Sequence, residues 1–212
     1  MENIRTSEAV HQTAGGILFL VGAAVFAVVF TLLMAQPAHA ERVTPPPMPA
    51  DLEAPAGNRA YLVGHAAGTQ QYICLPTGWT QFGPQATLFE DDDKQIITHF
   101  LSPNPDEFGT PRPTWQHSKD TSAVWGGAAV SSSDPAFVAP GAIPWLRLPV
   151  AGVQEASRGG GKLAKTTYIQ RLNTSGGVKP STGCTEPTEV GNKMLVPYTA
   201  DYYFYTDANA RD

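Results

Sequence analysis

The chain has 212 residues, of which 42% are apolar and 16% are charged, with a net charge of −5 at neutral pH. Ordinary soluble domains carry about 25% charged residues, and the sequence has no block of Lys or Arg. This composition argues against a nucleic-acid-binding protein and against an electrostatic membrane patch. The 20 glycines and 19 prolines favour turns and extended segments over long helices.

The first forty residues have the organisation of an export signal. A polar stretch precedes an almost unbroken apolar run over residues 17–34, and Ala38-His39-Ala40 then places small residues where signal peptidase requires them. We therefore predict a signal peptide over residues 1–40, cleaved after Ala40, and a secreted or periplasmic protein. The alternative is an uncleaved anchor, because this apolar run is just long enough to span a bilayer. Membrane contact would then involve that segment alone.

A Pro-rich linker is predicted over residues 41–56, because Pro45–Pro47 and Pro49 favour extended backbone. From residue 57 to residue 206, short apolar runs alternate with turn residues at intervals of about ten residues, which is typical of a sandwich or barrel. The predicted strands are 60–65, 70–74, 85–89, 95–101, 122–129, 143–150, 166–172, 195–199 and 201–206.

The connections between these runs predict their pairing. Ala66–Thr69 and Glu90–Lys94 are each flanked by two apolar runs and predict hairpin turns. Residues 102–114, 131–142 and 154–165 are rich in Pro, Gly or Ser and predict long loops. We therefore expect one all-β domain, a sandwich or distorted barrel of about eight to ten short strands with little helix. A C-terminal tail is expected over residues 207–212.

Cys74 and Cys184 are the only cysteines in the sequence. An even pair usually bridges in an oxidising compartment, so one disulfide is predicted. The loop that it closes predicts a stabilisation of about 4–5 kcal/mol in the chain-entropy model. A redox or metal role is disfavoured, because the two cysteines are far apart in sequence and form no C-x-x-C motif. The bridge would bring an early strand next to a late one.

Several segments of the chain carry a family pattern. They are Gly64-His65, Gln71–Cys74 with Trp79, Thr98–Phe100, Pro113–Trp115, Ala142–Leu146, Tyr168–Gly177 with Cys184, and Val196–Tyr202. Together they resemble the DUF3455 family of exported bacterial and fungal proteins over residues 54–206. The resemblance implies a single exported domain. It implies no activity, because that family is defined by sequence alone.

No catalytic motif is recognisable, so we assign no catalytic residue, metal or cofactor. A hydrolytic triad of a histidine with Asp120 and Ser122 lacks the G-x-S-x-G nucleophile turn. A metal site at His99 and His65 lacks the usual spacing of histidine ligands. A nicotinamide cofactor would need a strand followed by G-x-G-x-x-G, which is absent.

Two groups of residues remain as candidates for a role. Trp115, His99 and Asp120 are the candidate ligand-binding residues, because an aromatic face, an imidazole and a carboxylate follow or flank a Pro-rich stretch. Arg171 lies in the middle of a predicted strand, where a charge is costly unless it is paired. We predict a structural ion pair between Arg171 and Asp201.

Three functions are consistent with these features. The favoured hypothesis is a non-enzymatic, exported domain that binds a small ligand, a glycan or a protein in the cell envelope or outside the cell. The second is a metal-assisted hydrolase or oxidoreductase centred on His99. The third is a structural envelope protein without a ligand of its own.

Overall fold

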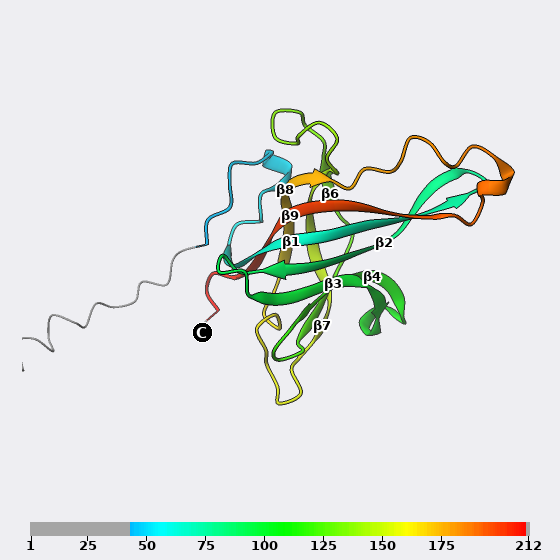
Figure 1. Cartoon of the computed structure of the whole chain (residues 1–212). Coiled ribbons are helices and arrows are strands. Elements are labelled where there is room, and N and C mark those ends of the chain that lie inside the picture. Colours follow the sequence, from blue (N-terminus) through cyan, green and yellow to red (C-terminus); the bar gives the residue numbers. More distant parts are fainter. Residues whose placement is uncertain (1–42, 211–212) are drawn as a thin grey trace, which may run out of the picture. The chain divides into compact units, whose positions relative to one another are not determined.

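The structure is a computed structural model that describes residues 43–210, in which nine antiparallel strands carry the fold (Figure 1). The strands are β1 (Asn58–Leu75), β2 (Gly78–Phe89), β3 (Gln95–Asn104), β4 (Thr110–His117), β5 (Ala123–Gly126), β6 (Val130–Ser132), β7 (Trp145–Gln154), β8 (Tyr168–Gly176) and β9 (Lys193–Asp207). Over these residues, the helical elements are three short 3₁₀ turns, η1 (Ala50–Leu52), η2 (Pro105–Glu107) and η3 (Pro187–Glu189). Within residues 43–210, no helix is long and apolar enough to span a membrane.

Eight of these strands close into a barrel. Hydrogen-bonded neighbours follow the order β5-β4-β3-β2-β1-β9-β8-β7, and β5 pairs with β7 to complete the ring. The first part of β7 also pairs with β6, which is one extra strand beside the barrel. Ring closure satisfies the backbone groups that an open sheet would leave at its edges. The predicted all-β domain with little helix is therefore confirmed, as a barrel.

The predicted hairpin turn at Ala66–Thr69 is wrong, because β1 runs through it without interruption. This stretch pairs with β2 on one side and with β9 on the other. Gly68 serves close strand approach here, since a Cβ atom at this position would lie 2.5 Å from Ala86 Cβ. The turn between β1 and β2 is instead at residues 76–77. The turn predicted at Glu90–Lys94 is confirmed by the hydrogen bond from Glu90 N to Lys94 O, 2.9 Å.

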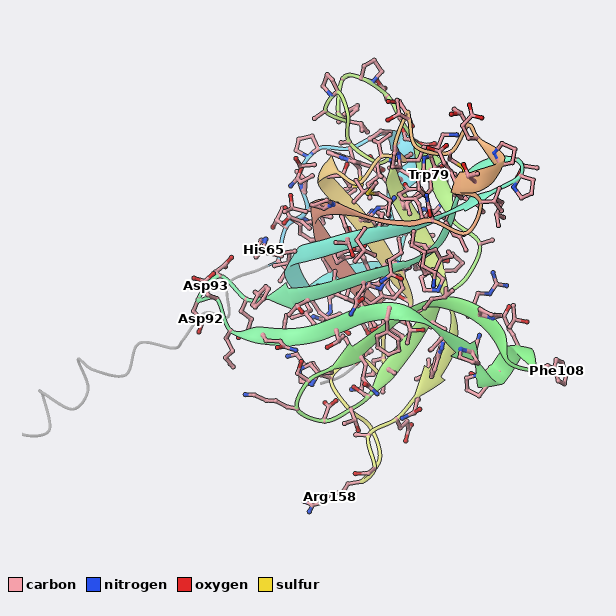
Figure 2. The ribbon with its side chains drawn as sticks, turned by 45° about the vertical axis from the view of Figure 1, so that its right-hand side comes forward. His65, Trp79, Asp92, Asp93, Phe108 and Arg158 are labelled. Atoms are coloured by element: carbon pink, nitrogen blue, oxygen red, sulfur yellow. A yellow bond between two sulfur atoms is a disulfide. The ribbon has the colours of Figure 1, made fainter. Side chains whose placement is uncertain are left out.

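The long loop predicted at residues 102–114 is also wrong. β3 continues to Asn104, β4 begins at Thr110, and only η2 and two further residues connect them. Pro103 and Pro111 lie opposite each other in this hairpin, because the φ angle that proline imposes is compatible with extended backbone. The loops that remain long are 133–144 and 155–167, and Arg158 marks the tip of the second in Figure 2.

Two apolar clusters flank the barrel wall. The inner cluster fills much of the barrel and includes Leu88, Ile97, Val124, Ile169 and Phe204. The outer cluster packs Val43, Met48 and Leu52, with Phe137, Val138 and Ala142, against side chains of β1, β7, β8 and β9.

The Pro-rich segment before β1 is part of the packed structure. Its backbone is extended apart from η1, as expected for a linker, but Leu52 is 0% exposed. Gln170 Nε2 also donates to Leu52 O at 2.6 Å. The packed structure therefore begins no later than residue 43. The predicted signal peptide at residues 1–40 lies outside the described residues.

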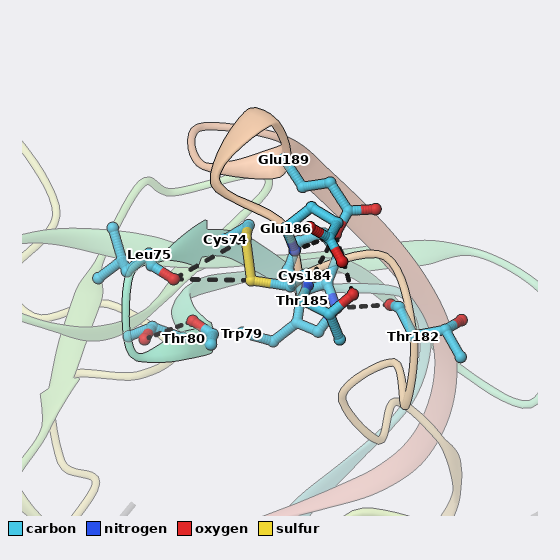
Figure 3. Close-up of a disulfide and its surroundings, with 10 residues drawn as sticks. Cys74, Leu75, Trp79, Thr80, Thr182, Cys184, Thr185, Glu186 and Glu189 are labelled. Atoms are coloured by element: carbon cyan, nitrogen blue, oxygen red, sulfur yellow. Dashed lines mark hydrogen bonds between the residues drawn. A yellow bond between two sulfur atoms is a disulfide. The ribbon is translucent and has the colours of Figure 1, made fainter.

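An arm extends from one end of the barrel, formed by the far parts of β1, β2 and β9 (Figure 1). Cys74 near the end of β1 is bonded to Cys184 in the connection between β8 and β9, with 5.5 Å between the two Cα atoms (Figure 3). Trp79 Nε1 also donates to Thr182 O in this connection, at 2.8 Å. The predicted disulfide is therefore present, and it attaches the connection to the arm.

Candidate functional site

The barrel contains a cavity of about 430 Å³ near the end from which the arm extends. Residues from seven of the eight barrel strands line it, and the rest of the lining comes from the connection between β5 and β6, from β6 itself and from Pro144 just before β7. The lining residues that matter most below are Gln70, His99, Trp115, Leu146, Arg171 and Tyr202. Because so many strands contribute, the cavity exists only in the closed barrel.

Aromatic rings form one wall of this cavity. The rings of His99 and Trp115 are stacked, with their centroids 4.3 Å apart and their planes 10° apart. Tyr202 meets Trp115 edge-on at 5.6 Å. His99 on β3 is the direct register partner of Trp115 on β4, so strand pairing brings the two rings together. Gly126 also lies against the Trp115 ring, since a Cβ atom at this position would be 3.0 Å from it.

His99 is neutral in this environment. Burial lowers the pKa of His99 to about 3, although its hydrogen bond to Thr114 O acts in the opposite direction, and the charge of Arg171 lowers the pKa further. Nδ1 lies 2.8 Å from Thr114 O. A carbonyl can only accept, so the single proton of the neutral ring is on Nδ1. A base with so low a pKa is poorly matched to proton transfer near neutral pH.

Arg171 is the only charged side chain that lines the cavity among the described residues. Its Nη2 donates to Pro144 O at 2.8 Å, whereas its Nε is buried without an acceptor. Burial raises the pKa of Tyr202, and the positive charge of Arg171 acts against that rise. Over residues 43–210, no carboxylate forms a salt bridge with Arg171. The cavity therefore holds a positive charge without an acidic neighbour.

The predicted ion pair between Arg171 and Asp201 is wrong. Arg171 is the register partner of Tyr202, and Asp201 is the register partner of Leu172. Successive side chains of a strand point to opposite faces of the sheet. Arg171 and Tyr202 therefore face the cavity, while Asp201 faces the outside of the barrel, where it accepts from Asn173 Nδ2 at 2.7 Å.

Two neutral side chains of the cavity wall also carry donors without acceptors. Gln70 Nε2 and Trp115 Nε1 are buried and have no hydrogen-bond partner. The Gln70 oxygen is already used, because it accepts from Gln81 Nε2. Buried polar groups are normally paired, and an unpaired donor costs about 1–3 kcal/mol. The wall thus has an excess of donors over acceptors.

Asp120 lies away from the cavity and anchors a loop. Its Oδ2 accepts from the backbone N–H of Lys162 and its Oδ1 accepts from Ser122 Oγ, both at 2.7 Å. Burial raises the pKa of Asp120, but these hydrogen bonds outweigh it and lower the pKa to about 2. The carboxylate lies between Ser122 and His117, whose Nδ1 is 3.2 Å from Asp120 Oδ1. A triad needs the serine next to the histidine, so this is not one.

His65 belongs to a separate, open hollow on the outer face of the barrel. Its Nδ1 is 2.7 Å from Asp201 Oδ1, and its Nε2 is 2.9 Å from Asp91 Oδ1. Figure 2 shows His65 beside the turn that carries Asp92 and Asp93. Within the described part of the chain, no three His, Cys, Asp or Glu side chains are placed to hold a metal ion. His65 and His99 therefore lie in different sites.

The family assignment covers this barrel. A family model described as "Protein of unknown function (DUF3455)" matches residues 55–206. The chain belongs to the DUF3455 family. The match extends from just before β1 to the penultimate residue of β9, so the cavity lies within the DUF3455 domain. No curated protein and no solved structure matches the chain.

The structure groups the expected site residues in a different way. Trp115 and His99 share the cavity of the DUF3455 domain, whereas Asp120 does not reach it. Arg171, Gln70 and Tyr202 join them, and sequence reasoning did not place these three residues in a site. The one available signal was the charge of Arg171 within an otherwise apolar strand, which we assigned to an ion pair.

Proposed function

We propose that this DUF3455 protein is a binding module that holds one small molecule in its barrel cavity. The observation that carries this proposal is the cavity of about 430 Å³ bounded by seven strands. Barrels of eight strands are either filled by side chains or hold one small ligand. Ligand sites usually have volumes of about 300–1,000 Å³ and combine apolar or aromatic walls with a few polar groups. The stacked His99 and Trp115 with Arg171 fit that description.

The size and lining of the cavity favour small-molecule binding over a protein-binding, an enzymatic or a purely structural role. A bound protein would need an extended surface, whereas a cavity of this size suits a small ligand or a single sugar ring on an aromatic wall. An enzyme centred on His99 gains no support, because this imidazole is neutral and among the described residues has no carboxylate in the cavity beside it. A purely structural protein would be expected to fill its barrel with side chains.

We further propose that binding takes place outside the cytoplasm. The signal-like residues 1–40 support export. The bond between Cys74 and Cys184 supports it independently, since disulfides persist mainly in oxidising compartments.

A fragment screen read out at the cavity tests the binding proposal. The purified protein is screened by NMR against a panel with equal numbers of carboxylates, phosphate monoesters, sugars, amides and amines. We expect some compounds to shift the indole N–H signal of Trp115 in a saturable way. Leu146→Trp, which places an indole in the cavity, should abolish these shifts. Leu195→Trp, at a residue that is 57% exposed on the arm, should leave them unchanged.

Two results would count against the binding proposal. One is a panel in which no compound shifts the Trp115 signal. The other is binding that persists equally in a folded Leu146→Trp protein. Should that variant fail to fold, Ala129→Trp at the exposed rim of the cavity replaces it in the comparison.

A further inference from the structure

We infer that the ligand of the barrel cavity is a small organic anion, whose carboxylate or phosphate group is held by Arg171. This inference rests on the proposed function, because it names the chemical class of ligand for the same cavity. The wall of the cavity carries a net positive charge among the described residues. Arg171 lines the cavity, and no Asp or Glu among the described residues does.

The position of Arg171 makes its charge available to a ligand. Two other arginines among the described residues have protein partners outside the cavity. Arg112 pairs with Glu107 at 2.7 Å, and Arg147 donates to Asp51 O at 3.2 Å. Arg171 donates to Pro144 O and also interacts with the Tyr202 hydroxyl, but its buried Nε has no acceptor. A guanidinium with unused donors matches the planar, two-oxygen geometry of a carboxylate or phosphate.

The neutral groups of the wall point to the same chemistry. Gln70 Nε2 and Trp115 Nε1 are two more donors without an acceptor. A ligand rich in acceptor oxygens would balance this excess of donors, whereas a cationic ligand would meet a like charge and add further donors.

The remaining wall indicates what the anion carries. His99, Trp115 and Tyr202 present aromatic rings, and Leu146 and Leu148 add apolar surface. A body of a few carbon atoms, such as a ring, can pack on these side chains while its charged end reaches Arg171. Inorganic ions would leave this apolar wall unused.

Matched pairs of compounds test the inference. Each carboxylate and each phosphate monoester of the panel is titrated beside its uncharged amide or alcohol, with the Trp115 indole signal as the readout. We expect the anions to bind at least about tenfold more tightly than their neutral partners, as charge-assisted hydrogen bonds require. The two anion arms then show whether carboxylates or phosphates are preferred.

The variant Arg171→Met tests whether the guanidinium of Arg171 holds the anionic group of the ligand. We expect this variant to bind the anions about tenfold more weakly and to change the affinity of the neutral partners much less. Its melting temperature without ligand should stay the same or rise, because an arginine without an acidic partner contributes little to folding. Arg147→Met, on the outer wall of the neighbouring strand, is the matched control and should bind like the wild type.

Three outcomes would overturn the inference while leaving small-molecule binding intact. They are neutral compounds that bind in the cavity as tightly as their anions, binders that include no anion, and anion affinity that is unchanged in Arg171→Met. A fourth outcome, in which no compound of any class shifts the Trp115 signal, would instead remove the proposed function on which the inference rests.

Discussion

At the residue scale, two histidines of the same barrel wall have opposite ionisation behaviour. His99 faces the interior, where burial lowers its pKa to about 3. His65 faces outwards, where burial also acts to lower its pKa but the hydrogen bonds and charges of Asp201 and Asp91 outweigh it and raise the pKa. With a carboxylate at each ring nitrogen, His65 is best satisfied as the imidazolium, which donates from both.

The raised pKa of His65 predicts a pH-dependent contribution to stability. A group whose pKa is higher in the folded state than in the unfolded state stabilises the fold fully below its unfolded pKa, and this contribution is lost as the pH rises through the folded pKa. The stability difference between wild type and His65→Gln should therefore be largest near pH 5.5 and should shrink towards pH 8.5. Urea unfolding at several pH values measures it.

A neighbouring carboxylate provides the control for this experiment. Asp92 lies in the same turn as Asp91, but its Oδ1 accepts from the Lys94 backbone N–H. The difference in unfolding free energy between wild type and Asp92→Asn should therefore not change with pH as His65 titrates. If the loss of unfolding free energy in His65→Gln stays constant or grows between pH 6.5 and 8.5, the two carboxylates do not raise the pKa of His65.

At the element scale, the segment before β1 shows that a Pro-rich stretch can be part of a packed domain. Its prolines keep the backbone extended, and η1 turns Leu52 against the outer face of the barrel. Gln170 on β8 then binds the carbonyl of Leu52 and also accepts from Tyr205 Oη at 2.6 Å. Composition alone cannot distinguish this arrangement from a free linker, because both are extended.

Truncation of Leu52 tests whether this segment stabilises the domain. Leu52→Ala should lower the free energy of unfolding by about 2–5 kcal/mol, the range for a fully buried leucine. Leu195→Ala, at an exposed site on β9, should change it by no more than about 0.5 kcal/mol. Chemical denaturation gives both values. An equally small effect for Leu52→Ala would mean that residues 43–56 act as a linker in solution.

At the scale of the whole molecule, barrel closure depends on segments that are far apart in sequence. β1 pairs with β9 over most of its length, and the bond between Cys74 and Cys184 crosses a sequence separation of 110 residues near the end of the arm. Such long-range contacts have a high entropic cost, and a covalent link reduces it by restricting the unfolded chain.

Loss of the disulfide should therefore destabilise the whole domain. The double variant Cys74→Ser/Cys184→Ser is expected to lose about 4–5 kcal/mol of unfolding free energy in the chain-entropy model. Treatment of the wild type with a reductant should produce a similar loss, and the same reductant should not affect the double variant. A loss confined to local fraying of residues 177–192, with an unchanged global transition, would contradict this expectation.

The sequence by itself determined the class of the fold, the disulfide and the family, because each depends on local patterns or on residue counts. It also identified Trp115 and His99 as a pair of interest, although not their stacking. Only the tertiary structure decided that Arg171 faces a cavity and that Asp120 and Asp201 do not. The physical reason is register: the face on which a strand residue lies depends on partners far along the chain and on closure of the ring, and a shift of one residue would reverse it.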